Sequence, residues 1–218
     1  RSTLFPYTTL FRSNLSIMVK RVAETVDSKL SVSTLHRMFR GIGLSTGKNT
    51  IIEYMGRCQE AYLLFGVTNA VATFVEREGS PRYYLADNGL LSLFLDHDDS
   101  ALLKNVVAVA LHDAYGEELH YLKSPKTGID MDFYVPDAGL AIQVTHSITE
   151  RARKREVQSL AKLSRVQDDI RRLVIVTKEE QETIAVDGTS IEVIPAWRFL
   201  LQRSEEHTSE LQSQPQIS

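Results

Sequence analysis

The segment GIDMDFYVPDAGLAIQVT, residues 128–145, gives the clearest indication of the fold in this chain. It predicts two β-strands, 129–135 and 140–145, because both segments are rich in β-branched, aliphatic and aromatic residues. The sequence Pro-Asp-Ala-Gly at 136–139 favours a tight turn between them, since Pro, Asp and Gly are the residues that turns prefer. The segment is therefore expected to form a β-hairpin.

Four polar side chains of this hairpin form the first candidate site. Side chains alternate across a strand, so Asp130 and Asp132 are expected on one face of the first strand. Gln143 and Thr145 are expected on one face of the second. A strand–turn–strand that places a carboxylate beside a Gln-x-Lys or Glu-x-Lys pair resembles the core of the restriction-endonuclease-like fold, often written PD-(D/E)xK. In this resemblance Asp132 takes the acidic position, Gln143 the second position, and Thr145 stands where the fold has its lysine.

The residues around the hairpin predict the other elements of that fold. The apolar helix 100–115 and the apolar strand 173–177 are expected to be buried, and Thr149 is expected to cap a helix that runs to about Val166. The expected order is helix 100–115, strand 118–123, the hairpin, the capped helix, strand 173–177, strand 191–194 and a short helix from Pro195. This order, α-β-β-β-α-β-β-α, is that of the endonuclease-like fold, so this half is expected to be α/β or α+β.

The preceding part of the chain predicts a different domain. Its expected elements are helices at 14–28, 34–42 and 48–62 and short strands at 63–67, 72–76 and 82–85. Three helices with a tight turn before the third, followed by a β-ribbon, describe a winged helix-turn-helix. The acidic stretch after Leu95 is a suitable boundary, which predicts a winged-helix domain at 14–95 and an endonuclease-like domain at 96–202.

The third helix of a winged helix-turn-helix is its recognition helix. It is expected to face Ile51, Ile52, Met55 and Cys58 inward. The residues expected to contact DNA are Lys48, Asn49, Thr50, Tyr54 and Arg57, with Arg77 or Arg82 at the wing. This set carries few positive charges, so a packing or protein-contact role is the alternative.

A second basic region lies in the sequence ERARKRE at 150–156, which contains Arg151, Arg153, Lys154 and Arg155. These side chains can bind phosphate groups of a DNA backbone, and such contacts weaken with salt. The alternative is an ordinary solvated helix face, where most runs of charge lie.

Residues 43–50, GLSTGKNT, resemble a phosphate-binding P-loop but depart from its spacing. The P-loop has four residues between its glycines and a Ser or Thr directly after the Lys, where the hydroxyl holds Mg²⁺. Here three residues separate Gly43 from Gly47, and Asn49 follows Lys48. The motif therefore does not predict a nucleotide site of that class.

Composition indicates a chain of one or two domains with a sizeable core: 218 residues, 43% hydrophobic and 24% charged. The single cysteine, Cys58, fits a reducing cytosol, so a cytoplasmic location is expected. No apolar run reaches the roughly 18 residues of a membrane helix, so no membrane partner is expected. The net charge of −3 gives no overall attraction to nucleic acid.

Both ends of the chain resemble translated adapter sequences used in short-read DNA sequencing. The resemblance covers LFPYTTLFRS near the start and RSEEHTSELQS near the end. Residues 1–13 and 203–218 are therefore expected to be non-native, and they are excluded from fold reasoning as a tag is. The natural gene is expected to extend beyond both ends, which makes this chain a fragment.

Residues 14–202 together resemble the C-terminal half of bacterial and archaeal AAA-type ATPases that carry the domain of unknown function DUF4143. The order and spacing of several segments carry the resemblance: 30–65, 83–91, 102–105, 130–133 and 142–144. The resemblance implies that an N-terminal P-loop domain holds ATP and Mg²⁺ in the parent chain. No cofactor is expected in the fragment itself.

Only some of the family's nuclease-like positions are matched in this chain. Asp132 and Gln143 match, but Lys104 stands where the family has Glu on the long helix, and Thr145 replaces the lysine. Phosphodiester hydrolysis in this fold requires acidic groups that hold Mg²⁺ and a lysine that positions or activates water. Asp132 is the metal ligand if there is one, with Asp130 as a second carboxylate. No catalytic residue is therefore expected.

The leading hypothesis is a non-catalytic regulatory or binding portion of an AAA-type ATP-binding protein, which recognises DNA or a protein partner. One alternative is a metal-dependent nuclease of the PD-(D/E)xK type. Another alternative is a free-standing winged-helix DNA-binding regulator. The sequence predicts no oligomeric state.

Overall fold

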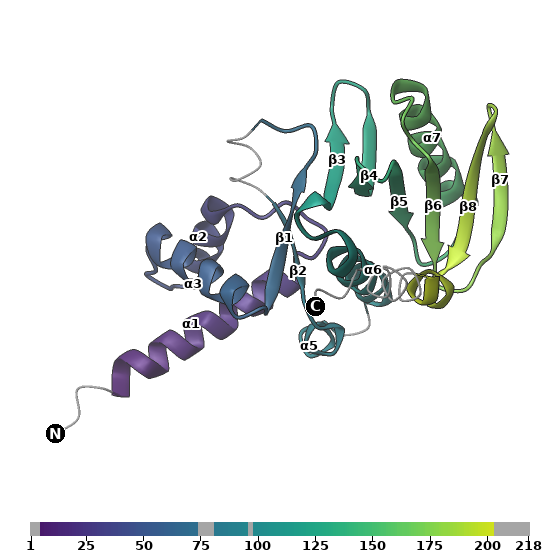
Figure 1. The fold of residues 1–218 in the computed structure, drawn as a ribbon. Coiled ribbons are helices and arrows are strands. Elements are labelled where there is room, and N and C mark those ends of the chain that lie inside the picture. Colours follow the sequence, from purple (N-terminus) through teal and green to yellow (C-terminus); the bar gives the residue numbers. More distant parts are fainter. Residues whose placement is uncertain (1–4, 74–80, 96–97, 203–218) are drawn as a thin grey trace, which may run out of the picture. The chain divides into compact units, whose positions relative to one another are not determined.

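The computed structural model describes residues 5–73, 81–95 and 98–202 and shows a mixed α/β protein (Figure 1). The described residues divide into two units. Those up to Thr68 and from Ala72 to Asp98 form the first unit, and those at 69–71 and from Asp99 onward form the second.

The first unit combines helices with a short antiparallel strand pair. Its elements are α1 (Phe5–Ala23), α2 (Val32–Gly41), α3 (Lys48–Glu60), β1 (Leu64–Asn69), β2 (Arg82–Leu85) and α5 (Asn88–Ser92). The strands pair with Leu64 opposite Leu85. The strand expected at 72–76 falls mostly outside the described residues, and its first two residues are not in a strand.

Capping residues begin two of these helices. The Ser31 hydroxyl accepts a hydrogen bond from the Thr34 amide at 3.1 Å and begins α2. The Asp87 carboxylate accepts from the Leu90 amide at 2.6 Å and begins α5. Helix α1 differs from its expected range, because it already includes Phe5 and ends at Ala23.

The inward face of α3 differs from the prediction at one position. Ile51, Met55 and Cys58 are buried as expected, but Ile52 is 54% exposed. Tyr54 is buried in its place. Successive residues are about 100° apart around a helix, so a stripe through Ile51, Met55 and Cys58 takes in position 54 and leaves position 52 outside.

The second unit is built on a mixed sheet with helices on it. Its elements are α6 (Asp99–Tyr115), η1 (Gly116–Glu118), β3 (His120–Ser124), β4 (Ile129–Val135), β5 (Leu140–Val144), α7 (Glu150–Val166), β6 (Arg172–Thr177), β7 (Glu182–Val186) and β8 (Thr189–Pro195), followed by helical residues 196–202. The strands lie in the order β3-β4-β5-β6-β8-β7 (Figure 1). The pairs β5–β6 and β6–β8 are parallel, and the others are antiparallel.

Helix α7 covers one face of this sheet. Thr149 caps it as predicted, because its hydroxyl accepts from the Ala152 amide at 3.3 Å. Its residues Val157, Leu160 and Leu163 share a core cluster with buried residues of β3, β4, β5, β6 and β8. The amphipathic stripe of the helix therefore fixes which of its residues reach the sheet.

The hairpin that the sequence predicts is present, with β4 at its expected bounds. Gly139 lies in the turn at a φ of +59°, a conformation that L side chains rarely adopt. An added Cβ there would lie 2.4 Å from the Asp169 carbonyl oxygen. The Gly139 carbonyl also accepts hydrogen bonds from the amides of Arg171 and Arg172, at 2.8 and 3.0 Å. The turn thus joins β4 and β5 to the chain that enters β6.

Strand β7 was not predicted. It pairs with β8 across the turn Asp187-Gly188, where φ is +51° and +77°. Two residues with positive φ are typical of a two-residue hairpin turn, and Asp-Gly is a preferred sequence for it. Ile184 and Val186 pack against the core cluster. The alternation of inward and outward residues beside the Asp-Gly turn was therefore the sequence signal for this strand.

Within the described residues, no helix is both long enough and apolar enough to span a bilayer.

Candidate functional site: the fork between β4 and β5

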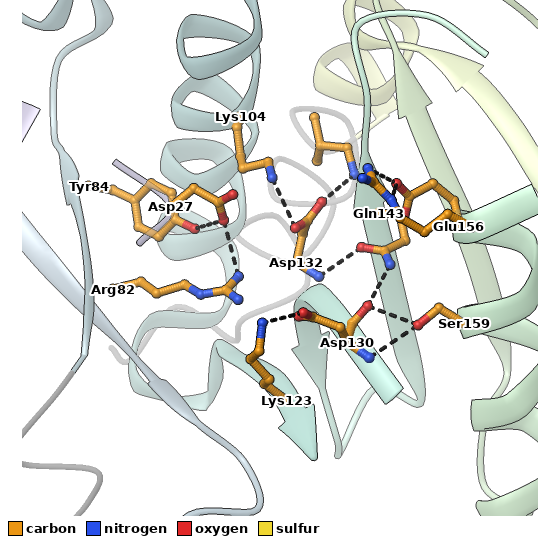
Figure 2. Close-up of polar contacts among 12 residues, drawn as sticks. Asp27, Arg82, Tyr84, Lys104, Lys123, Asp130, Asp132, Gln143, Glu156 and Ser159 are labelled. Carbon is orange, nitrogen blue, oxygen red and sulfur yellow. Dashed lines mark hydrogen bonds and ion pairs between the residues drawn. The ribbon is translucent and has the colours of Figure 1, made fainter. Parts of the chain in front are cut away.

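Strands β4 and β5 separate at Asp132, and we call the space between them the fork. Their backbone pairing ends with Phe133 opposite Ile142. Beyond that pair, the Gln143 side chain lies between the strands (Figure 2). Its amide oxygen accepts from the Asp132 amide at 2.9 Å, and its amide nitrogen donates to the Asp130 carbonyl at 2.6 Å.

The Gln143 side chain therefore forms the two hydrogen bonds that the backbone of a neighbouring strand would otherwise form with β4. It is 3% exposed, and a buried amide of this kind is stable because its hydrogen bonds are satisfied. The register between β3 and β4 also shifts here, since His120 pairs with Tyr134 but Leu122 pairs with Met131. The extra residue in β4 is a β-bulge next to Asp132, a feature that redirects side chains locally.

Both carboxylate oxygens of Asp132 have partners inside the protein. Lys104 of α6 places its ammonium 3.0 Å from Oδ1, and the Val144 amide of β5 donates to Oδ2 at 2.8 Å. The Asp132 and Lys104 side chains are 15% and 16% exposed. Asp132 thus accepts a hydrogen bond from the backbone of β5 where the two strands separate, and its negative charge balances that of a largely buried lysine (Figure 2).

Asp130 is held differently, although it is only two residues away. The Ser159 hydroxyl of α7 donates to its carbonyl at 2.9 Å and accepts from its amide at 3.1 Å. Its carboxylate forms an ion pair with Lys123 of β3 at 2.5 Å, with both side chains about half exposed. Each of the two aspartates therefore has a lysine partner from a different element.

Glu156 of α7 is a member of this region that the sequence reasoning did not single out. It is 4% exposed, and burial is the main reason why the pKa of its carboxyl is raised; the nearby Asp132 also raises the pKa, while Arg155 and Lys104 lower it. Arg155 donates to Glu156 Oε1 at 2.8 Å. One signal was available, because position 156 lies on the same helical stripe as Leu160 and Leu163.

The described contacts of Thr145 and His146 lie outside the fork. The Thr145 hydroxyl donates to the Ser147 carbonyl at 3.1 Å, and its amide donates to the Val176 carbonyl of β6 at 3.0 Å. His146 lies 3.6 Å from Asp99, which also pairs with Lys178 at 3.1 Å. The hydrogen bond from Lys178 is the main cause of the lowered pKa of Asp99.

Two of the four basic residues expected to bind DNA on α7 are paired with acids. Arg153 donates two hydrogen bonds to the Glu182 carboxylate of β7, at 2.9 and 2.7 Å, and Arg155 pairs with Glu156. Arg151 and Lys154 are exposed on the same helix. The positive charge available to a ligand is therefore smaller than the sequence run indicates.

The residues of the first unit that were expected to contact DNA differ in their exposure and in their ion pairs. Lys48 and Asn49 are exposed and Thr50 is half-buried at the start of α3, and Arg57 is paired with Glu53 at 2.7 Å. Tyr54 is 5% exposed, so its ring belongs to the core and the prediction that it contacts DNA is wrong.

The wing residues give one further correction. Arg82 is 5% exposed and forms an ion pair with Asp27 at 3.1 Å (Figure 2). It is therefore a buried structural residue and not an exposed wing contact. Arg77 lies outside the described residues.

Among the described residues, no group of three or more His, Cys, Asp or Glu side chains is arranged to hold a metal ion. Comparisons with known proteins assign no family either: no family model, no curated protein and no solved structure matches the chain.

Proposed function

We propose that this chain is a non-catalytic binding portion of a larger AAA-type ATP-binding protein of the DUF4143 class. In this proposal the second unit is an endonuclease-like domain whose fork has become a structural element. The first unit is a winged-helix module, and DNA or a protein is the partner. ATP and Mg²⁺ belong to a separate domain of the parent chain.

The Lys104–Asp132 ion pair is the observation that supports this proposal. A nuclease of this fold requires carboxylates that are available to Mg²⁺, which prefers oxygen ligands in octahedral geometry. Here an ammonium lies 3.0 Å from one oxygen of Asp132, and a backbone amide donates to the other at 2.8 Å. A divalent cation at Asp132 would be repelled by the positive charge of Lys104. The Lys104–Asp132 ion pair is therefore more favourable here than metal binding.

A plasmid-cleavage assay tests the proposal. The chain is incubated with supercoiled DNA and Mg²⁺ or Mn²⁺, beside Asp132→Ala as the control. We expect no metal-dependent cleavage above the control. Cleavage by the natural chain that disappears in Asp132→Ala would contradict the proposal and support the nuclease.

Glu156 is the observation that keeps a nuclease as the second candidate. It lies near enough to Asp132 for the two charges to interact, so it supplies a second carboxylate beside the fork. If the site is a latent nuclease, replacing the cation that is paired with Asp132 by Lys104→Glu should give metal-dependent cleavage. A Lys104→Glu variant that folds and does not cleave would remove this candidate.

A further inference from the structure

The first unit contains a pocket of about 510 Å³ where α2 is followed by the loop to α3. It is lined by residues from the last turns of α2 and from the loop: His36, Arg40, Gly43, Leu44, Ser45, Thr46 and Gly47. None of these lining residues is acidic. The pocket also lies directly before the first turn of α3.

The start of α3 supplies backbone donors at this pocket. Its N-cap is Gly47, which has no side chain to cap the helix. The first backbone bond of the helix is from the Ile51 amide to the Gly47 carbonyl at 3.2 Å. In the part of the chain that the structure describes, the amides of residues 48–50 therefore have no acceptor. These amides carry the partial positive charge of a helix N-terminus, and the first turn has no acidic residue to offset it.

Thr46 gives an independent reason to expect a ligand. It is only 7% exposed, and it lines the pocket. Its hydroxyl forms no hydrogen bond with any described residue. Among the described residues, its oxygen is not one of the fully buried polar atoms that lack a partner, so it is open to the pocket that it lines. A bound acceptor in the pocket would take the hydrogen bond that this hydroxyl offers.

Two basic side chains complete the pocket. His36 and Arg40 lie four residues apart on α2, so they share one helix face. Within the described residues neither has an ion-pair partner. Lys48 stands at the start of α3 and donates to the Ser33 hydroxyl at 3.2 Å. The nearest acid of α3, Glu53, is already paired with Arg57.

We propose that this pocket binds one phosphate group of a phosphate ester. The amides of residues 48–50, the Thr46 hydroxyl and the Arg40 guanidinium together offer more donors than a carboxylate accepts easily, and helix N-termini with charged donors are suited to phosphate. The site is not a P-loop, because it lacks that spacing and its Mg²⁺-binding hydroxyl. It depends only on the first unit and not on the state of Asp132.

Two sources of such a phosphate share this chemistry: the backbone of DNA, and free phosphate or a nucleotide. A titration with inorganic phosphate, followed through the ¹⁵N–¹H resonances of the full chain, tests the pocket itself. Arg40→Gln and Thr46→Val remove two donors. Arg37→Gln is the matched control, because Arg37 is exposed on the same helix and does not line the pocket.

We expect a saturable shift of the amide resonances of residues 46–50 with phosphate and not with chloride. Arg40→Gln should weaken it about tenfold and Thr46→Val about threefold, while Arg37→Gln should change it less than about twofold. Because Arg40 is exposed, its variant should melt at the same temperature as the natural chain. The absence of a saturable shift, or equal weakening by Arg40→Gln and Arg37→Gln, would overturn the proposal.

Fluorescence anisotropy with a short DNA duplex then identifies the source. If the phosphate belongs to DNA, Arg40→Gln should weaken binding about tenfold and reduce the slope of log K against log salt by about one. If it belongs to a free ester, a nucleoside monophosphate should shift the same amides, and DNA binding should be equal in Arg40→Gln and Arg37→Gln. Neither result depends on cleavage at the fork, so this proposal and the proposed function can fail separately.

Discussion

The Lys104–Asp132 pair should be the most costly ion pair of the fork to break. At an effective dielectric constant of about 20, two unit charges about 4 Å apart attract by roughly 4 kcal/mol, and this pair is closer at 3.0 Å. Desolvation offsets much of that attraction because both side chains are about one-sixth exposed. We therefore expect a net coupling free energy of about 2 kcal/mol, between the values for surface pairs and for fully buried pairs.

The perturbation is Lys104→Met, which keeps most of the apolar stem and removes the charge. It should lower the free energy of unfolding by about 2 to 3 kcal/mol, because it leaves Asp132 without its cation. Urea unfolding followed by the fluorescence of Trp197 measures this, since Trp197 is the only tryptophan and lies in the second unit. A double-mutant cycle with Asp132→Asn isolates the coupling from the other effects of each change.

Lys123→Met is the matched control. Lys123 pairs with Asp130, two residues from Asp132, but both of these side chains are about half exposed. A solvent-screened pair of this kind should cost less than about 1 kcal/mol to break. Equal losses for Lys104→Met and Lys123→Met, or a coupling below about 0.5 kcal/mol, would refute the view that the Lys104 pair is a buried structural contact.

Three other substitutions in the second unit should change its stability. Gln143→Leu should destabilise the second unit by about 2 to 3 kcal/mol, because two buried backbone groups of β4 lose their hydrogen-bond partner. If urea unfolding shows a loss of stability no larger than that of a surface substitution, the two hydrogen bonds of the Gln143 amide do not stabilise the fold. Glu156→Gln should stabilise the chain near neutral pH and have no such effect near pH 4. The pKa of Glu156 is raised in the folded state, so its ionisation removes stability as the pH rises above the unfolded pKa; a stabilisation that is the same at both pH values would contradict this sign. Gly139→Ala should cost about 2 kcal/mol more than Gly188→Ala, because both glycines have positive φ but only the first would press an added Cβ against backbone; equal melting temperatures would exclude that clash.

The local elements of the second unit were predictable because their signals are local. Strand β4 and the start and end of α7 agree with the expected ranges, since Thr149 caps the helix and Pro-Asp-Ala-Gly makes the turn. Strand β7 was missed because its five residues are partly exposed and lack a long apolar run. The mixed α/β class is confirmed, while the winged-helix and endonuclease-like assignments stay predictions.

The contacts that determine the chemistry of the fork were not predictable in the same way. Lys104 and Asp132 are 28 residues apart. The family resemblance placed both among the nuclease-like positions, but no local pattern indicates that they form an ion pair. The sequence identified Gln143 and Asp132 as neighbours but not that the Gln143 amide would bridge two backbone groups. Glu156 was hidden in a basic run that was interpreted either as a phosphate-binding surface or as a solvated face, whereas its position on the apolar stripe places it inside.

The Lys104 ammonium lies beside the Asp132 carboxylate, where a divalent metal would bind, so the fork should hold no such metal. A calorimetric titration of Mn²⁺ into the unsubstituted chain and into Asp132→Asn tests this expectation. We expect no difference between the two titrations up to about 1 mM Mn²⁺, because the ammonium already occupies one side of the carboxylate. A Mn²⁺ site with a dissociation constant below about 0.1 mM that disappears in a folded Asp132→Asn variant would contradict the account.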